Sequence, residues 1–232
     1  MSARKQPPQQ PPPVQRLRVR YAKRGRARFA SHRDFGRAFE RALRRAGVPM
    51  AFSSGFHPHP RISYVNAAPT GAASEAEYLE IGLAEVRDPA RVRDDLNAAM
   101  PDGLAIIEVV EAAGGSLPEL LAASTWQVAW SVGEVLEAAI ATLLAADEVL
   151  VQRQAKSGLR SFDVRGAVLA LAPAEDGFVV TVRTSEPLVR PDDVVAALRQ
   201  LRPELPATPA LFTRLAQGPW DGRDVRDPLA AE

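Results

Sequence analysis

The spacing of apolar residues along the chain predicts alternating strands and helices. Over residues 17–21, apolar residues alternate with arginines, which is typical of a strand that buries one face. Over residues 35–46, apolar residues recur at intervals of three and four, which predicts a helix with one buried face. Ser31 and Asp34 have the spacing of a capping box at the start of this helix, and Gly47 is a typical stop.

The order of the predicted elements indicates two related halves. In the first half, further elements are predicted at 50–53 (a short strand), 62–65, 79–83, 89–100 (a helix) and 104–110. In the second half they are predicted at 126–132, 135–144 (a helix), 149–153, 159–165, 178–183, 191–201 (a helix) and 211–215. Residues 167–172 fit either a strand or a helix. We therefore expect an α+β fold of two tandem ferredoxin-like (βαββαβ) halves, with antiparallel sheets and helices on one face.

Composition shifts along the chain place the domain boundaries. Residues 1–13 are rich in Pro and Gln, and residues 218–232 are rich in Pro, Gly and Asp. Neither stretch has apolar periodicity, so both are expected to be disordered or loose. The predicted parts are an arm (1–13), a first half (14–111), a linker (112–124), a second half (125–217) and a tail (218–232).

The composition excludes several classes of protein chemistry. The chain has 232 residues, of which 46% are hydrophobic and 25% charged, so it can bury a substantial core. Cysteine is absent, which excludes disulfides, thiolate zinc sites, cysteine-ligated iron–sulfur clusters and a cysteine nucleophile within this chain. No uninterrupted apolar run approaches ~18 residues and no signal-peptide core is present, so we expect a cytoplasmic protein without a membrane span.

The formal net charge of +1 conceals a strong asymmetry. Residues 1–61 contain 15 Lys and Arg but only two acidic residues, a net charge of +13, whereas residues 62–232 have a net charge of −12. A cationic segment of this strength favours an anionic partner such as RNA, a nucleotide or an acidic protein surface. The alternative is a set of solvated arginines that only balances the acidic remainder of the chain.

Candidate binding residues concentrate between 31 and 65, where all three histidines and five arginines of the predicted helix are found. The candidates for substrate or anion binding are Arg18, Arg20, Arg28, His32, Arg33, Arg37, Arg41, Arg44, Arg45, His57, His59, Arg61, Lys156 and Arg160. We assign no catalytic residue and no metal site, because neither a nucleophile nor a third metal ligand lies near the His57-Pro58-His59 loop. His32, His57 and His59 remain candidates as general bases, although a stacked or hydrogen-bonded loop histidine explains each of them without catalysis.

Several motifs carry a family resemblance that spans residues 15–216. The strings LRVRY, FASHRD, FERALRRA and SGFHPHPRIS, together with the strand at 75–83, resemble the radical-SAM-linked family; the match is looser in the second half, at 156–165. That bacterial family of unassigned biochemistry stands beside, or is fused to, a radical SAM protein. The resemblance implies a radical SAM partner. Because this chain has no cysteine, S-adenosylmethionine and an iron–sulfur cluster are expected only in that partner, and no cofactor is expected here.

These observations lead to three functional hypotheses. The first is a noncatalytic, RNA-binding accessory protein that works with a radical SAM enzyme in the modification of RNA or another translation-related substrate. The second is a metal-independent RNA-processing enzyme that uses the histidine and arginine surface. The third is a protein–protein adaptor whose arginines meet an acidic partner. The sequence does not indicate an oligomeric state.

Overall fold

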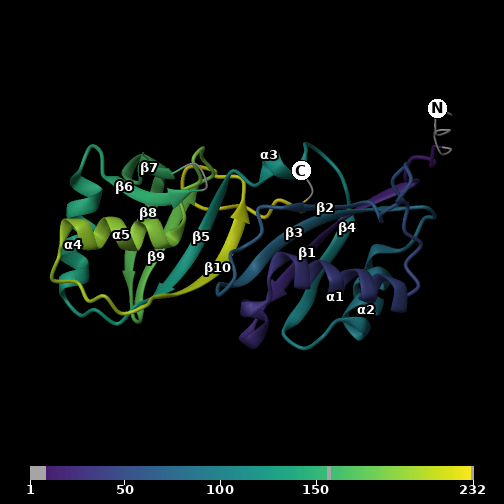
Figure 1. Ribbon diagram of the computed structural model, residues 1–232, viewed down its shortest axis with the longest axis horizontal. Helices are drawn as coiled ribbons and strands as arrows, with labels where there is room; N and C mark the ends of the chain where they lie inside the picture. Colours follow the sequence, from purple (N-terminus) through teal and green to yellow (C-terminus); the bar gives the residue numbers. More distant parts are fainter. Residues whose placement is uncertain (1–8, 156–157, 231–232) are drawn as a thin grey trace, which may run out of the picture. The chain divides into compact units, whose positions relative to one another are not determined.

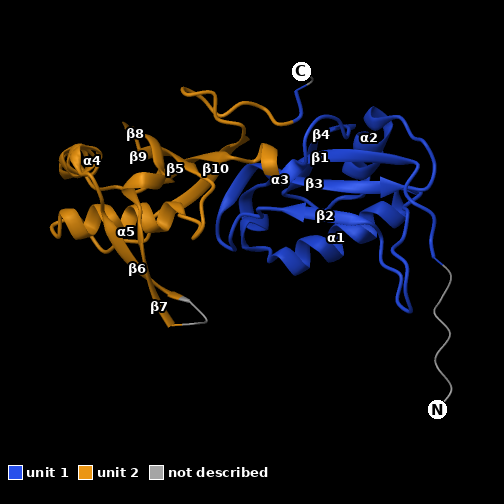
Figure 2. Ribbon diagram, turned by 90° about the horizontal axis from the view of Figure 1, so that it is seen from above, with its two compact units in different colours: residues 1–118, 229–232 blue, residues 119–228 orange. Residues whose placement is uncertain are grey.

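The computed structural model describes residues 9–155 and 158–230, which form two compact units (Figures 1 and 2). Unit 1 consists of residues 1–118 and 229–232, and unit 2 of residues 119–228. Both units combine helices with antiparallel strands, so the expectation of a mixed α+β fold is confirmed. Among the described residues, no helix is long and apolar enough to cross a membrane.

Unit 1 has a four-stranded sheet in the spatial order β4-β1-β3-β2, and all neighbouring strands are antiparallel. β1 is a central strand, with Leu17 opposite Ile81 of β3 and Val19 opposite Val109 of β4. The elements of this unit are β1 (Gln15–Lys23), η1 (Gly25–Phe29), α1 (His32–Arg45), β2 (Ile62–Val65), β3 (Ala73–Leu83), α2 (Pro89–Ala99) and β4 (Leu104–Glu111).

The core of unit 1 lies between one face of this sheet and both helices. Phe35 and Phe39 of α1 are at most 2% exposed, and Leu96 of α2 is fully buried in the same cluster. The ring of Phe35 stacks on that of Tyr21 of β1 with centroids 4.0 Å apart, and Phe39 continues the stack at 5.6 Å. Each fully buried side chain of this size contributes about 1.5–3 kcal/mol through removal of apolar surface from water. The helix stripe expected from the sequence is therefore the buried face of α1.

Within unit 2, antiparallel strands lie in the order β10-β5-β9-β8, and β6 and β7 form a separate hairpin. The helices α4 and α5 contact each other and bury apolar stripes that include Ile140 and Leu198. The elements of this part of the chain are α3 (Leu117–Leu120), β5 (Ala123–Ala129), α4 (Val135–Ala145), β6 (Leu150–Ala155), β7 (Gly158–Asp163), η2 (Arg165–Ala167), β8 (Val168–Ala174), β9 (Gly177–Arg183), α5 (Pro191–Leu201) and β10 (Leu211–Gly218).

In the second half, the segments that form the sheet strands differ from those expected. The segment at 167–172, which the apolar pattern left open between strand and helix, belongs to strand β8 and pairs with β9. The segments at 149–153 and 159–165, counted in the sequence as strands of the repeated pattern, instead form the β6-β7 hairpin outside the main sheet. Among the described side chains of the hairpin, only Val151 and Phe162 are buried, while its other large apolar residues, Leu150 and Leu159, are exposed.

Several segments expected to be irregular make specific contacts. Gln10, in the predicted arm, donates its backbone N–H to Ser54 Oγ at 2.9 Å; residues 1–8 lie outside the described part. The segment at 112–124 contains α3 and the start of β5, and the boundary between the units falls within it. In the predicted tail, the Asp221 carboxylate accepts two backbone N–H bonds that form a turn. Conversely, residues 50–53 make only single bridges and form no strand.

Gly36 of α1 provides a test of the fold. A Cβ atom at this position would stand 3.4 Å from Tyr64 Oη, an ordinary van der Waals distance. Because alanine favours a helix over glycine, Gly36→Ala should raise the free energy of unfolding by about 0.5–1 kcal/mol in urea denaturation. The matched control is Gly103→Ala, where φ is +83° and the added Cβ would lie 2.8 Å from Arg24 O, so the same change should destabilise the protein. A loss of stability in Gly36→Ala would show that Tyr64 leaves no room for a methyl group at this position.

Candidate functional site

Helix α1 begins with the capping box expected from the sequence. Ser31 Oγ accepts the backbone N–H of Asp34 at 3.2 Å, and the Asp34 carboxylate accepts the Ser31 hydroxyl at 2.7 Å and the Ser31 backbone N–H at 3.3 Å. These hydrogen bonds, from the side chain first and then the backbone, lower the pKa of Asp34, and nearby Arg37 and Arg33 act in the same direction. The helix start is therefore fixed by a carboxylate that stays ionised near neutral pH.

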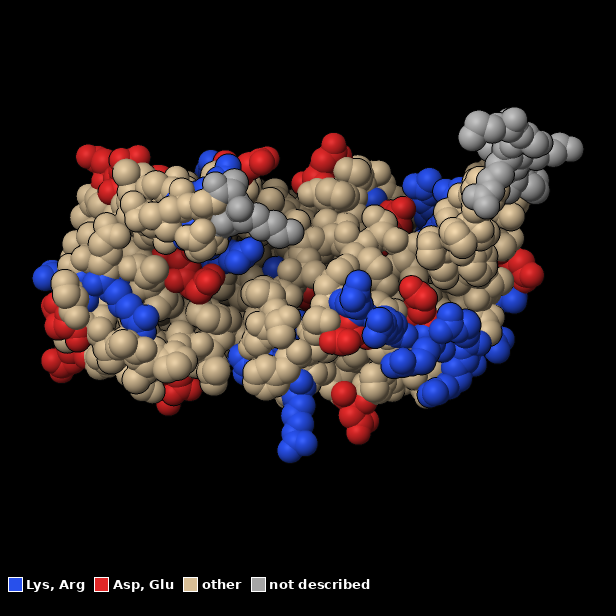
Figure 3. Space-filling model, in the orientation of Figure 1, with Lys and Arg blue, Asp and Glu red and all other residues tan. Residues whose placement is uncertain are grey.

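The solvent side of α1 carries an arginine face, defined as Arg33, Arg37, Arg41, Arg44 and Arg45. All five side chains are exposed, and they contribute to the cluster of basic side chains that covers α1 (Figure 3). In the described part of the chain, the ion pair within 4 Å on this face is Arg44 with Glu40, at 3.9 Å. An exposed pair of this kind contributes at most about 1 kcal/mol, so the guanidinium groups remain available to a ligand.

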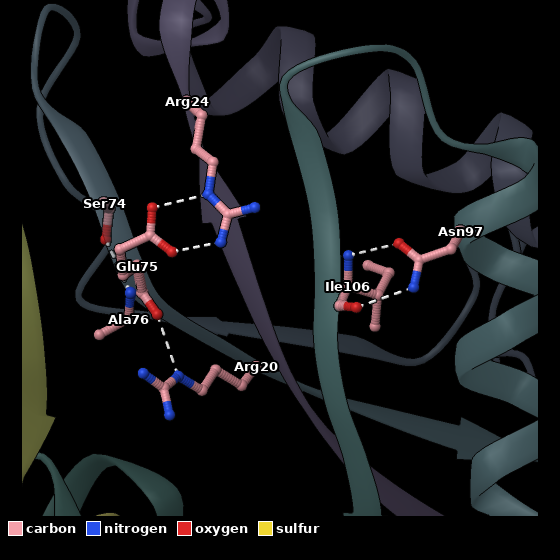
Figure 4. Close-up of polar contacts among 7 residues, drawn as sticks. All are labelled: Arg20, Arg24, Ser74, Glu75, Ala76, Asn97 and Ile106. Atoms are coloured by element: carbon pink, nitrogen blue, oxygen red, sulfur yellow. Dashed lines mark hydrogen bonds and ion pairs between the residues drawn. The ribbon is translucent and has the colours of Figure 1, made fainter.

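Four other candidate arginines donate to backbone carbonyls of unit 1. Arg20 Nε donates to Glu75 O at 3.0 Å, and Arg28 Nε to Gly71 O at 2.6 Å (Figure 4 shows the first). Arg61 Nε donates to Phe52 O at 3.1 Å. Arg18 Nη1 donates to Ala113 O. These donors help to hold loops and strand ends in place.

Arg18 differs most from its sequence prediction, because the strand pattern placed it on a solvent face. Its side chain is buried, and its guanidinium donates to the carbonyls of Ala113 and Gly115, both at 2.5 Å. It also lies 3.6 Å from the Glu80 carboxylate. The alternation of residues in β1 correctly predicts which face Arg18 is on, but the chain beyond β4 folds back over that face and gives the guanidinium internal acceptors.

A bidentate ion pair joins the end of β1 to the start of β3, and no local sequence signal predicted it. Arg24 Nε donates to Glu75 Oε1 at 2.7 Å, and its Nη2 to Glu75 Oε2 at 2.5 Å (Figure 4). The hydrogen bond to Glu75 raises the pKa of Arg24, so the guanidinium group stays charged. It occupies one acidic side chain that would otherwise oppose an anionic ligand on this unit.

The three histidines lie at the start of α1 and in the loop that follows this helix in the chain. His57 and His59 are exposed in a loop after α1, whose base is closed by a hydrogen bond from Ser53 N to His59 O at 2.8 Å. The backbone N–H of His59 also donates to Ser53 Oγ at 3.0 Å. His32, the first residue of α1, packs edge-on against Tyr64 with centroids 4.7 Å apart. Among the described residues, no three His, Asp or Glu side chains are grouped closely enough to hold a metal ion.

Tyr64 of β2 is held beneath the first turns of α1. Its ring also meets Phe35 edge-on, and its buried hydroxyl has no hydrogen-bond partner among the described residues. Burial, and then the charge of Glu40, raises the pKa of Tyr64 to about 12. Tyr64 therefore stays neutral and cannot serve as a base near neutral pH; it supports the position of His32 instead.

In unit 2, Arg160 is exposed on β7, and Lys156 lies outside the described residues. The residue opposite Arg160, Arg153, has a structural role: its Nη1 donates to Asp193 Oδ2 at 2.5 Å and its Nη2 to Leu188 O at 3.0 Å. Burial raises the pKa of Asp193, against the opposing effects of a backbone hydrogen bond from Arg190 and the charge of Arg153. Arg153 therefore attaches the hairpin to the start of α5.

The structure exposes three phenylalanines that the sequence analysis did not identify as surface residues. The exposed fractions of Phe29, Phe52 and Phe56 are 66%, 43% and 62%. Phe29 and Phe56 lie in segments without helix or strand periodicity, so no apolar neighbour is predicted to cover them, whereas Phe52 lies in the segment that was expected to be a short strand.

Residues 16–191 match the profile of a family described as "Uncharacterized protein conserved in bacteria (DUF2344)". The chain belongs to this family. The family description names no radical SAM protein, so the association expected from the sequence remains a proposal. No curated protein matches the chain. An unknown protein from Galdieria sulphuraria, known from a crystal structure, is similar over 82% of this chain and 92% of its own, with 16% sequence identity and a TM-score of 0.26.

The capping box generates a prediction about stability and pH. Ser31→Ala should lower the free energy of unfolding by about 1 kcal/mol at pH 7, because the helix loses its N-cap acceptor. Asp34 has a lowered pKa in the folded state, so its contribution is present above the usual aspartate pKa and is lost as the pH falls through the folded value. Urea denaturation should therefore show the difference between wild type and variant narrowing in acid, below the usual aspartate pKa.

The control for this experiment is Ser63→Ala on β2, an exposed serine outside any helix cap. It should leave stability within about 0.5 kcal/mol of wild type at each pH. A Ser31→Ala effect that is equal at neutral and acidic pH would show that the carboxylate of Asp34 takes no part in the cap.

Proposed function

We propose that this protein is a noncatalytic accessory protein that binds RNA through the arginine face of α1. The observation that supports this most strongly is the placement of five exposed arginines on one helix of 14 residues, opposite a fully buried aromatic stripe. Folding requires the buried stripe but has no need of five guanidinium groups on the other side. A concentrated cationic surface of this kind suits a polyanion, because each phosphate that it neutralises releases condensed counterions.

Arginine suits RNA better than lysine would. Its planar guanidinium presents paired N–H donors to phosphate oxygens, and it stacks on bases as well. The positions of Arg37, Arg41 and Arg45 follow one another at intervals of one helical turn, so their guanidinium groups form a row along the helix. A row of donors with regular spacing matches the repeating charge of a nucleic-acid backbone more closely than the irregular acidic patch of a protein.

The partner in this proposal is a radical SAM enzyme that modifies RNA or another translation-related substrate. Its support is the resemblance of the α1 and histidine-loop motifs to the radical-SAM-linked family. Because the chain contains no cysteine, S-adenosylmethionine and the iron–sulfur cluster belong to the partner in this scheme. The role left for this chain is to hold the substrate.

The proposal extends to the fold. Each unit has its four sheet strands in the spatial order that the βαββαβ pattern requires, β4-β1-β3-β2 in unit 1 and β10-β5-β9-β8 in unit 2. We regard both units as variants of the ferredoxin-like fold, with the β6-β7 hairpin as an insertion between α4 and β8.

The arginine face can be tested by charge reversal. Arg37→Glu combined with Arg41→Glu should weaken binding of a labelled RNA by roughly 10-fold or more and lower the salt dependence of log K by about two. Fluorescence anisotropy over a salt series measures both quantities. The matched control, Arg183→Glu with Arg223→Glu, changes the net charge equally at exposed positions of unit 2 and should leave binding nearly unchanged. Equal losses in the two variants would indicate a nonspecific effect of net charge.

The histidine loop separates the accessory function from an enzymatic one. His57→Ala with His59→Ala should cause only a modest loss of RNA affinity, which higher protein concentration overcomes. If a histidine were a general base, RNA cleavage by the isolated protein would be observed and would fall by ~100-fold or more at saturating substrate, with little change in binding. Gel analysis of incubated RNA, with wild type and variant side by side, decides between these outcomes.

A further inference from the structure

The exposed phenylalanines lie in the segments that immediately precede and follow α1, the helix that carries the arginine face. Phe29 ends η1, two residues before the Ser31 cap of α1, whereas Phe52 and Phe56 belong to the loop that follows the other end of the helix. Helix α1 has 14 residues and so spans about 20 Å between these two ends. Among the described residues, every phenylalanine with an exposed fraction above 40% lies in this one stretch of unit 1.

The loop that carries Phe56 is built to hold its shape. A bridge between Phe52 and Pro60 and the hydrogen bond from Ser53 N to His59 O close its base, and Pro58 restricts the backbone inside it. Gln10 adds a further hydrogen bond to Ser54 at 2.9 Å. An aromatic ring on a preorganised loop loses little conformational entropy when it binds a ligand. Removing an exposed aromatic ring from water is also favourable, so a ligand with a flat apolar face gains binding free energy when it covers the ring.

A ligand that satisfies both features must present phosphates and accessible aromatic faces together. Single-stranded RNA does so, because its bases can turn outward and stack on phenylalanine while the backbone lies on the arginines. Duplex RNA presents the same phosphates, but its bases are already stacked within the helix. An acidic protein surface would satisfy the arginines and leave the exposed rings without a specific partner.

We propose that this surface selects single-stranded over double-stranded RNA, with bases stacked on Phe29 and Phe56 and the intervening phosphates on the arginine face. This inference rests on the proposed RNA-binding function and specifies its substrate class. The two groups of residues then have separate roles. The arginines supply affinity that depends on salt concentration, and the phenylalanines supply a preference for single strands that does not depend on salt concentration.

The test uses the full chain with one labelled RNA strand, alone and annealed to its complement. Wild type should bind the single strand at least roughly 10-fold more tightly than the duplex at the same salt concentration. Phe29→Ala with Phe56→Ala should reduce single-strand affinity by roughly 10-fold or more and leave both the duplex affinity and the salt dependence unchanged. Phe29→Trp with Phe56→Trp should retain the preference, because a larger aromatic ring still stacks.

A matched control replaces two exposed apolar residues of unit 2, Leu159→Ala with Leu188→Ala, which are 62% and 44% exposed. This variant should change neither the affinity for the single strand nor the affinity for the duplex. Equal binding of single strand and duplex by wild type, or equal losses on both RNAs in the phenylalanine variant, would overturn the inference while leaving RNA binding intact. Absence of binding to either RNA at low salt would instead overturn the proposed function itself.

Discussion

The stacking of Phe35 on Tyr21 is the contact on which the surface of unit 1 depends. The two rings are nearly parallel, with 7° between their planes, and Phe39 extends the stack along α1. A helix can rotate about its own axis unless something in the core fixes it, and close-packed aromatic rings do this more firmly than small aliphatic side chains. With this rotation fixed, the arginines of α1 have no direction available except toward solvent. The chemistry of the surface is thus set by a contact in the core.

The fold gives the candidate arginines among the described residues of unit 1 two different roles. In one group, Arg18 and Arg28 donate hydrogen bonds to backbone carbonyls, and Arg24 donates to the carboxylate of Glu75. The other group remains on α1, where Asp34 and Glu40 are the nearby acids. Net charge calculated from sequence treats these groups as equal, although a guanidinium that already donates to internal acceptors adds little to ligand affinity.

Features that depend on neighbours in the sequence were predictable. The capping box of Ser31 and Asp34, and the buried stripe of α1, follow from the spacing of a few adjacent residues. The strand faces of β1 followed from simple alternation, but the burial of Arg18 did not, because its acceptors at Ala113 and Gly115 are almost a hundred residues away. The pairing of Arg24 with Glu75 was not predictable for the same reason, because the two residues are 51 positions apart in the sequence. For β8, six apolar residues fit two periods equally, and only pairing with β9 decides between them.

The central position of β1 also has a consequence for the order of folding. Its two neighbours in the sheet are β3 and β4, so the first strand of unit 1 pairs with residues as distant as Glu111. During synthesis, β1 and α1 leave the ribosome long before either partner strand exists. The loop-closure entropy of these distant pairings must be paid before the sheet gains any ladder hydrogen bonds. A nascent chain would therefore hold the apolar stripe of α1 uncovered for most of the synthesis of unit 1, while its arginine face already carries full charge.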